Sequence, residues 1–318
     1  MILDTKIFDN KDAMIISGAN NKNIKIIEDY YNMQITIRGN DIFVLSDDLL
    51  IKEKLEEFFQ LLLKIIKKDA YINERDIIYL LKLQNENKLD KALDLYSNQI
   101  LISKDFNGKS IYAKTLNQKK YLYDMENKDL VFSIGPAGTG KTFLAVVYAV
   151  KTLKENKYKK IILTRPAVEA GESLGYLPGD LKEKVDPYLR PLYDGLNMML
   201  GFEQTENLIS KGIIEIAPLA YMRGRTLDNA FIILDEAQNT TIKQMKMFLT
   251  RLGFYSKMII TGDISQIDLP KGLKSGLKQA LEILKDIKNI GIIEFENLDV
   301  IRHPLVQLML ERYDKYEN

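Results

Sequence analysis

The 318-residue sequence contains no cysteine and a single histidine, His303. The lack of cysteine excludes disulfide frameworks and thiol catalysis, and with so little histidine it also excludes zinc ribbons and histidine-rich metal sites. Any bound metal ion must therefore be held by oxygen ligands. No apolar run approaches the roughly 18 residues that span a bilayer, and the first residues lack the layout of a signal peptide. We therefore expect a cytoplasmic protein without a membrane partner.

The composition is that of an ordinary globular protein, with 46% hydrophobic and 28% charged residues. This length allows one large domain or two ordinary ones, and we expect two. The net charge of +1 divides into −3 over residues 1–105 and +4 over the remainder. Neither part binds polyanions strongly by charge alone, because nonspecific affinity for nucleic acid comes from clustered lysine and arginine. A nucleic-acid partner must therefore be argued from motifs.

The first part of the chain, residues 1–105, is predicted to be a small α+β module with an added helical segment. Apolar periodicity predicts strands at 13–16, 33–38 and 42–45 and helices at 23–31 and 49–67, in the order β-α-β-β-α. Further helices are expected near 74–84 and 88–96. The polar, turn-rich stretch 106–117 is predicted to be a linker, which places a second domain at 118–318.

Beyond the linker, short apolar runs alternate with helical stretches. The apolarity of each run is continuous, as suits strands covered on both faces, and the helices between them supply the crossovers of a parallel sheet. The sequence therefore predicts an α/β domain whose parallel sheet is covered by helices. The predicted strands are 130–134, 161–164, 213–216, 231–234, 258–261 and 290–295.

A phosphate-binding loop follows the first of these strands. Residues 135–142 fit the pattern G-x-x-x-x-G-K-[ST] and lead into a helix at 143–150. In that pattern, backbone N–H groups surround phosphate oxygens, the lysine reaches the β and γ phosphates, and the threonine binds Mg²⁺. A merely glycine-rich turn is the alternative, but the strand-loop-helix context matches the motif. The predicted nucleotide-binding residues are Gly135, Pro136, Ala137, Gly138, Thr139, Gly140, Lys141 (also catalytic) and Thr142.

Two carboxylates end the apolar strand at 231–234. In this Walker B arrangement, Asp235 is predicted to hold Mg²⁺ through water, with Thr142 as the other metal-site residue. Glu236 is predicted to orient or deprotonate the attacking water, which implies hydrolysis of the nucleotide. The alternative is that Asp235 and Glu236 cap a helix beginning near Thr240.

Polar residues also end the strand at 258–261. Such a strand end lies near the γ-phosphate in P-loop folds, so Thr261, Asp263 or Gln266 is expected to sense hydrolysis by exchanging hydrogen bonds with phosphate and water. Gln266 is counted among the predicted catalytic residues. The alternative is a strand-to-helix turn in which Gly262 supplies the bend and Asp263 the cap.

Five sequence boxes in this order resemble those of PhoH-type ATPases. The likeness covers about residues 118–313, and five ordered boxes are far more specific than one. It implies a RecA-like P-loop NTPase core similar to that of superfamily 1 helicases, with ATP and Mg²⁺ as cofactors and hydrolysis linked to RNA. The boxes are 135–142, 164–180, 222–226 with 235–239, 261–263 and 300–304.

The resemblance also implies roles for single residues on either side of the loop. Gln118 occupies the place of a helicase glutamine that reads the adenine edge, and the alternative is a helix-entry residue with a solvated amide. Arg165 matches a segment that touches a nucleic-acid backbone. Pairing of Arg165 with Glu169 or Glu172 is the alternative.

Three further arginines are expected to act on the phosphates or on RNA. Arg302 matches an arginine finger or sensor and is counted as catalytic, while Arg223 and Arg225 compete for that role or for RNA contact. We expect the sequence to hold one such core only. The missing face of the ATP site is therefore expected from a neighbouring subunit of a homo-oligomer, by resemblance a hexameric ring.

The amino-terminal module resembles the KH-like domain that precedes the ATPase in many PhoH proteins. A KH domain clamps RNA with a G-x-x-G loop, whereas residues 18–22 read Gly-Ala-Asn-Asn-Lys and the module is net acidic. A protein-docking or oligomer-contact role is the alternative to RNA binding.

For the whole chain we expect an ATPase that remodels single-stranded RNA or an RNA–protein complex, with an RNA-processing protein as a further partner. A scaffold switched by nucleotide, in which RNA is incidental, is the alternative. A small-molecule kinase fits less well, because a glutamate beside the metal-binding aspartate suits water activation better than transfer to a bound alcohol.

Overall fold

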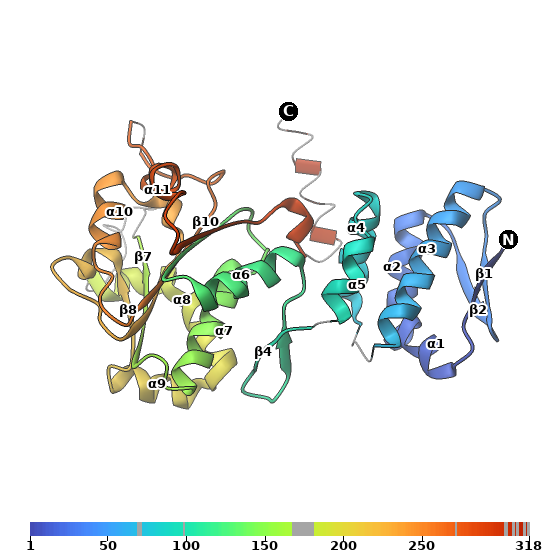
Figure 1. Ribbon diagram of the computed structural model, residues 1–318, viewed down its shortest axis with the longest axis horizontal. Coiled ribbons are helices and arrows are strands. Elements are labelled where there is room, and N and C mark those ends of the chain that lie inside the picture. The colour runs from blue at the N-terminus through green and yellow to red at the C-terminus, as the bar shows by residue number, and fades with distance from the viewer. Residues whose placement is uncertain are drawn as a thin grey trace. The chain divides into compact units, whose positions relative to one another are not determined.

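The computed structural model describes residues 1–68, 72–97, 99–166, 181–270 and 272–301, with residues 305, 306, 309, 312, 313 and 316 beyond them. The chain divides into two compact units (Figure 1), one formed by Met1–Gln99 and Ile301–Asn318 and the other by Ile100–Val300. Within the described residues, no helix has the length and apolarity needed to cross a bilayer.

The first unit packs helices on a small antiparallel sheet. The strand order is β1-β3-β2, and β3 pairs antiparallel with both neighbours. Alternate residues of β1 are buried, and α3 packs against this strand. The elements are β1 (Ile2–Lys6), α1 (Asn10–Ser17), α2 (Lys22–Tyr31), β2 (Ile35–Arg38), β3 (Asp41–Val44), α3 (Leu49–Ile66), α4 (Glu74–Asn85) and α5 (Asp90–Ser97).

The strand predicted at 13–16 is wrong, because these residues lie in helix α1. The side chain of Asp9 accepts a hydrogen bond from the N–H of Lys11 at 2.7 Å and caps the helix, which overrides the short apolar run. The sheet instead begins at β1. The order of elements up to α3 is therefore β-α-α-β-β-α, because both α1 and α2 lie between β1 and β2 in the chain. The resemblance to a KH-like domain stays a prediction.

The second unit begins with a two-stranded hairpin and continues as an α/β domain. Residues 106–117, expected to be a linker, instead contain β5 and the start of α6. The elements are β4 (Leu101–Lys104), β5 (Ser110–Tyr112), α6 (Leu116–Asn127), β6 (Leu130–Ile134), α7 (Lys141–Lys154), β7 (Lys160–Arg165), α8 (Leu181–Leu200), α9 (Phe202–Ser210), β8 (Ile214–Pro218), β9 (Ala230–Leu234), α10 (Ile242–Leu249), β10 (Lys257–Gly262), α11 (Gly276–Leu284) and β11 (Ile290–Glu294).

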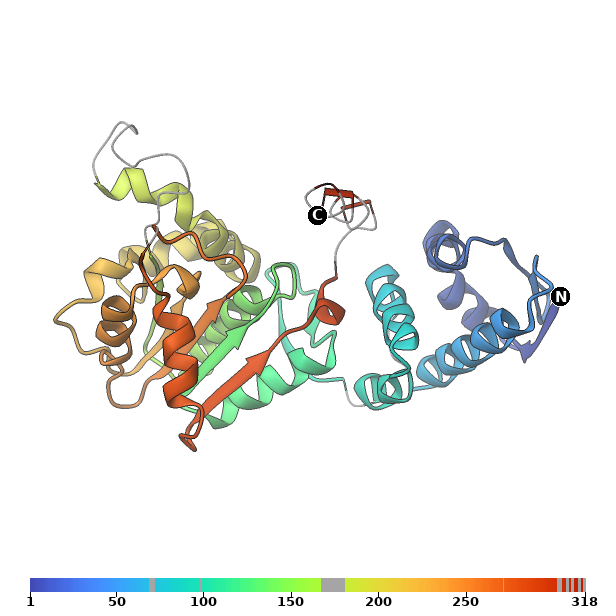
Figure 2. The same cartoon turned by 90° about the horizontal axis from the view of Figure 1, so that it is seen from above.

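The predicted parallel sheet covered by helices is confirmed as a RecA-like core. Its order is β11-β6-β10-β9-β7-β8, and all of its pairings are parallel. Figure 2 shows the last strand, in red, beside the green strand β6. Along β9, Phe231 and Ile233 pack with α7 and α8, whereas Ile232 and Leu234 pack with α10 and α11. Burial on both faces explains the continuous apolarity of β9.

The register of the sheet brings the ends of four strands to one edge. Thr261 of β10 is paired with Ser133 of β6, and Thr164 of β7 is paired with Leu234 of β9. Residues that directly follow β6, β7, β9 and β10 therefore share the carboxyl edge of the sheet, where ligands bind in open α/β folds.

Candidate functional site

The loop between β6 and α7 turns through three glycines with positive φ. Gly135 has φ 134°, and Gly138 and Gly140 each have φ 86°, values that residues with a Cβ rarely adopt. A Cβ atom at Gly135 would also collide with the carbonyl oxygen of Phe295. The N–H of Gly135 donates to the oxygen of Gly262 at 3.1 Å, which fastens the loop to β10. Only glycine therefore fits the first position of the loop.

Lys141 begins α7 and is almost wholly buried, with 8% of its surface exposed. Its Nζ donates to the carbonyl oxygens of Gly135 and Pro136, both at 2.7 Å. The hydroxyl of Thr139 also donates to Pro136, at 3.0 Å. Gly140 precedes the helix as its N-cap and has no side chain to cap the first N–H groups. The start of α7 is therefore a positive, uncapped helix end of the kind that binds anions.

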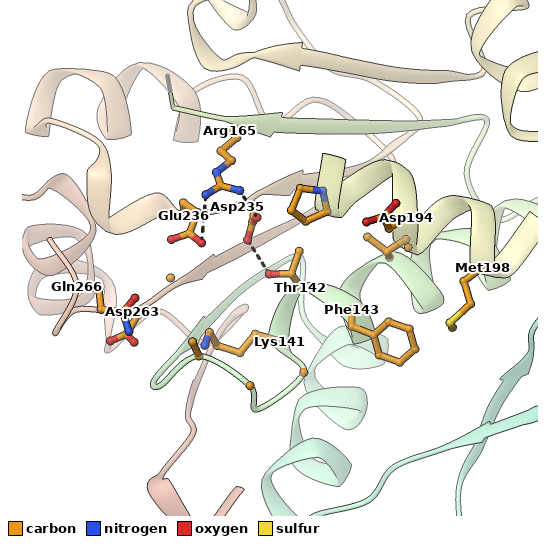
Figure 3. Close-up of a pocket in the computed structure, with 17 residues that line it drawn as sticks. Lys141, Thr142, Phe143, Arg165, Asp194, Met198, Asp235, Glu236, Asp263 and Gln266 are labelled. Atoms are coloured by element: carbon orange, nitrogen blue, oxygen red, sulfur yellow. Dashed lines mark hydrogen bonds and ion pairs between the residues drawn. The ribbon is translucent and has the colours of Figure 1, made fainter. Parts of the chain in front are cut away.

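Thr142, Asp235 and Thr261 form a hydrogen-bonded cluster at the carboxyl edge of the sheet, and Figure 3 shows the bond between Thr142 and Asp235. The hydroxyls of Thr142 and Thr261 donate to the same oxygen of Asp235, at 2.6 and 2.7 Å. The structure therefore brings together the two predicted metal-site residues, Thr142 and Asp235. A hydroxyl and a carboxylate that converge in this way are oxygen ligands of the kind that Mg²⁺ takes.

Glu236 is held on both sides of its carboxylate. Its backbone lies in the left-handed region, with φ 51° and ψ 40°, which costs about 1–3 kcal/mol in a residue other than glycine. Arg165 at the end of β7 faces one oxygen, with its NH2 atom 3.4 Å from Oε1 of Glu236. The Nε2 atom of Gln238 donates to the other oxygen, Oε2, at 2.5 Å.

The positions of Arg165 and Gln238 beside Glu236 were not predicted from the sequence. Arg165 was expected on a nucleic-acid backbone, and the structure places it inside the site, where its NH1 atom lies 3.8 Å from Oδ2 of Asp235. Its alternative partners, Glu169 and Glu172, lie outside the described residues. Gln238 was missed, and its signal was its place two residues after Glu236 in the Walker B box.

The alternative reading of Asp235 and Glu236 as helix caps is wrong. Helix α10 begins at Ile242, and its N-cap is Thr241. The hydroxyl of Thr241 accepts from the N–H of Gln244 at 3.3 Å, and the Gln244 side chain accepts from the N–H of Thr241 at 2.8 Å. This capping box leaves the two carboxylates to the cavity.

Asp263 follows β10 and caps the turn that comes after it. Its Oδ1 accepts from the N–H and the hydroxyl of Ser265, at 3.0 and 2.6 Å, so the predicted cap is present. Its Oδ2 is buried and has no hydrogen-bond partner among the described residues. Gln266 lines the same cavity as Asp263. The sensing role of Thr261, Asp263 or Gln266 stays a prediction.

A cavity of about 520 Å³ joins the phosphate loop, the carboxylates and helix α8. Figure 3 shows Phe143, Asp194 and Met198 on one side of Thr142 and Glu236 on the other. Sequence analysis missed the α8 residues, because they carry no motif and reach the loop only through the packing of α8 against α7. The cavity has the size of a small-molecule site.

Gln118 connects α6 to the phosphate loop and does not line this cavity. Its Nε2 donates to the carbonyl oxygen of Thr139 at 2.9 Å, and its Oε1 accepts from the N–H of Lys114 at 2.7 Å. The side chain is 7% exposed, so the alternative of a solvated amide is wrong. Reading of adenine by Gln118 would require this amide to exchange its partners, and that role stays a prediction.

Arg223 and Arg225 do not line the cavity either. Arg225 pairs with Glu215 through two hydrogen bonds, at 2.5 and 2.7 Å, and these bonds raise the pKa of the guanidinium. Arg223 is exposed directly after a short 3-10 helix, η3 (Leu219–Met222). Arg302 lies outside the described residues. The structure therefore leaves the identity of the finger arginine as a prediction.

The chain is similar to known proteins over most of its length. The family of PhoH-like proteins matches residues 110–314. The PhoH-like protein of Bacillus subtilis (strain 168) is 56% identical over 322 residues, which cover 99% of this chain and 98% of that protein. The PhoH-like protein of Mycobacterium tuberculosis (strain H37Rv) is 47% identical, covering 94% and 84%. Among solved structures, the UvsW helicase from bacteriophage T4 aligns with a TM-score of 0.37 at 13% identity, covering 66% of this chain and 67% of that one.

Proposed function

The chain belongs to the PhoH-like protein family, and we propose that it is a Mg²⁺-dependent ATPase that couples hydrolysis to the remodelling of RNA or of an RNA–protein complex. The observation that carries the proposal is the 2.6 Å hydrogen bond from Thr142 to Asp235, with Glu236 next in the chain. A metal-binding pair and a base then stand together at the head of a phosphate loop.

The residues of the loop fit a triphosphate and its metal ion. Gly138 and Gly140 turn the loop so that its N–H groups and the start of α7 can face phosphate oxygens. Thr142 and Asp235 would hold Mg²⁺, which supplies neutralisation of the charge that develops on the phosphates. Lys141 then donates to phosphate oxygens in place of the loop carbonyls that it contacts in this structure.

Glu236 is the proposed base for the attacking water, and its side chain lines the cavity. The water oxygen bonds to the γ-phosphorus while the bond to the β–γ bridging oxygen breaks, which yields ADP and phosphate. The carboxylate of Glu236 takes the proton that the water loses. Gln238 supports this role, because its hydrogen bond fixes one oxygen of the carboxylate.

RNA is the proposed partner because the resemblance to PhoH-type ATPases implies a link to RNA, and the guanidinium of Arg165 at the end of β7 suits phosphate recognition. A homo-oligomer, by resemblance a hexameric ring, is proposed because the second unit holds one six-stranded core. Arg165 is the one arginine that the described residues bring to the cavity, and it is paired with the Walker B carboxylates. A finger from a neighbouring subunit, with Arg302 or Arg223 as its source, would complete the site.

The test is phosphate release by the full chain with ATP and Mg²⁺, in the presence and absence of single-stranded poly(U). We expect hydrolysis that requires Mg²⁺ and increases with RNA. Chelation of the metal by EDTA and the Lys141→Ala variant supply the controls. Hydrolysis that RNA leaves unchanged would favour the nucleotide-switched scaffold. A chain that binds no ATP would contradict the assignment of the site.

A further inference from the structure

Arg165 and Glu236 meet inside the candidate ATP site, although they come from the ends of neighbouring strands β7 and β9. We propose that Arg165 is a latch on Glu236 that a phosphate oxyanion releases, and that single-stranded RNA supplies this phosphate. While the guanidinium of Arg165 contacts the Glu236 carboxylate, Glu236 does not act as a base. Binding of an RNA phosphate to the guanidinium breaks this contact. This inference rests on the proposed function, and it assigns to one residue the coupling between RNA binding and hydrolysis.

The first step is that both oxygens of the Glu236 carboxylate are engaged. Oε1 faces the guanidinium of Arg165 at 3.4 Å, and Oε2 accepts from Gln238 at 2.5 Å. A carboxylate oxygen that faces a guanidinium is directed at that group and not at an attacking water, so it is poorly placed to take the proton of the water. Release of one oxygen is therefore needed before Glu236 acts as a base.

The second step is that Arg165 is the partner open to a ligand from solvent. The amide of Gln238 is anchored at both ends, because its Oε1 also accepts from the N–H of Asp263 at 3.0 Å. Arg165 instead reaches the carboxylates at 3.4 and 3.8 Å, longer than the roughly 2.8 Å of a hydrogen-bonded ion pair. Its side chain is 22% exposed, against 7% for that of Asp235. It therefore lies where a ligand from solvent can reach it.

The third step is that Asp235 does not depend on Arg165. Two hydroxyls donate to Oδ1 of Asp235, from Thr142 at 2.6 Å and from Thr261 at 2.7 Å. Departure of the guanidinium leaves these bonds in place, so the metal-binding pair persists while Glu236 becomes free. The latch therefore acts on the base and leaves the nucleotide-binding groups unchanged.

The ligand class follows from the chemistry of the guanidinium, which binds phosphate oxygens through two parallel N–H groups. Two phosphates have this chemistry here, a backbone phosphate of RNA and the γ-phosphate of ATP in the same cavity. They predict opposite effects of removing Arg165. If RNA releases the latch, removal increases the rate without RNA, whereas a guanidinium that serves the γ-phosphate is needed for hydrolysis, and its removal lowers the rate.

The experiment compares wild type, Arg165→Ala and Arg165→Lys at saturating ATP and Mg²⁺, with and without single-stranded poly(U). For Arg165→Ala we expect a kcat without RNA about fivefold or more above wild type, at the lower end of the coupling seen between linked sites. The ratio of kcat with RNA to kcat without RNA should fall towards one, and KM for ATP should change little. Arg165→Lys should be intermediate, because a single ammonium cannot span both carboxylates as the guanidinium does. Arg38→Ala, which removes an exposed arginine from β2, is the control for loss of charge.

A gain of rate is a sharp readout, because structural damage lowers activity. A reduced kcat with an unchanged RNA stimulation ratio in Arg165→Ala would overturn release by RNA and would assign the guanidinium to the γ-phosphate. An unchanged kcat and ratio would overturn the latch altogether, while the ATPase proposal stands. Wild type that hydrolyses ATP without any response to RNA would overturn the RNA part of the proposed function together with this inference.

Discussion

Gln238 links Glu236 to Asp263, the residue that directly follows the neighbouring strand β10. Its Nε2 donates to Oε2 of Glu236 at 2.5 Å, while its Oε1 accepts from the N–H of Asp263 at 3.0 Å. Glu236 has φ 51°, and a strained backbone of this kind persists only where its surroundings hold it. The amide bridge is therefore part of what keeps the proposed base in position, and it links that base to the strand end that is expected to sense the γ-phosphate.

Replacement of Gln238 tests this bridge. Gln238→Glu removes the N–H donor and places a second carboxylate beside Glu236, so we expect kcat to fall by roughly 10- to 100-fold, since a hydrogen bond to a charged group contributes about 1.5–3 kcal/mol. KM for ATP should change little. Steady-state phosphate release over a range of ATP concentrations measures both, with Gln279→Glu on the exposed side of α11 as control. A wild-type kcat would show that Glu236 needs no support from Gln238.

Glu236→Gln should separate binding from hydrolysis. The amide keeps the size of the side chain and leaves Thr142 and Asp235 untouched, but it cannot accept a proton. We expect ATP to bind and stay intact, with a rate reduced by about 100-fold or more, the usual contribution of a general base. Retention of radiolabelled ATP on the protein, followed by analysis of the bound nucleotide, measures this. Recovery of ADP at the wild-type rate would assign the base to another group.

Lys141→Ala should abolish hydrolysis and weaken ATP binding. The variant removes the buried ammonium group at the head of α7, and loss of a group that stabilises developing charge lowers rates by about 10²–10³. Fluorescent-nucleotide binding and phosphate release are the measurements. Lys154→Ala, at the other end of the same helix, should leave both unchanged. Normal phosphate release by Lys141→Ala would contradict the site.

Gly135→Ala should disrupt the loop itself. The substitution meets both a φ of 134° and the carbonyl oxygen of Phe295, so we expect a loss of stability above about 2 kcal/mol and loss of ATP binding. Gly212→Ala is the matched control, because Gly212 also has positive φ, at 66°, but no atom within 4 Å of the added Cβ. It should cost about 1 kcal/mol and keep ATP binding. Thermal unfolding with and without ATP distinguishes the two, and equal losses would show that the contact with Phe295 is unimportant.

Mixing of inactive subunits tests the proposed oligomer. Glu236→Gln subunits lack the base, and Arg302→Ala subunits lack the predicted finger. If the finger acts between subunits, mixed assemblies contain some interfaces with an intact base on one side and an intact arginine on the other, so phosphate release should reappear. Arg223→Ala in place of Arg302→Ala tests the competing arginine. Light scattering that shows a monomer with undiminished activity on dilution would rule out action between subunits.

The amino-acid sequence alone determined the elements that depend on local pattern. The six strands of the sheet were predictable from their apolar runs, and the run is most continuous in the inner strands β6, β10, β9 and β7, which helices cover on both faces. The phosphate loop was predictable because its glycines, Lys141 and Thr142 are fixed in spacing by the strand-loop-helix turn itself. The short apolar run 13–16 led to a wrong prediction of a strand, because the cap at Asp9 begins a helix that includes these residues.

The side chains that meet from separate elements could not be predicted from the sequence and follow from the packing of the whole domain. Arg165 and Glu236 lie 71 positions apart, and they face each other because β7 pairs with β9 in parallel register. Asp194 and Met198 reach the cavity through the packing of α8 on α7, and the amide of Gln118 is taken up by the loop. Such contacts follow from strand order, register and helix packing. These depend on the whole core and produce no pattern in the spacing of residues along the sequence.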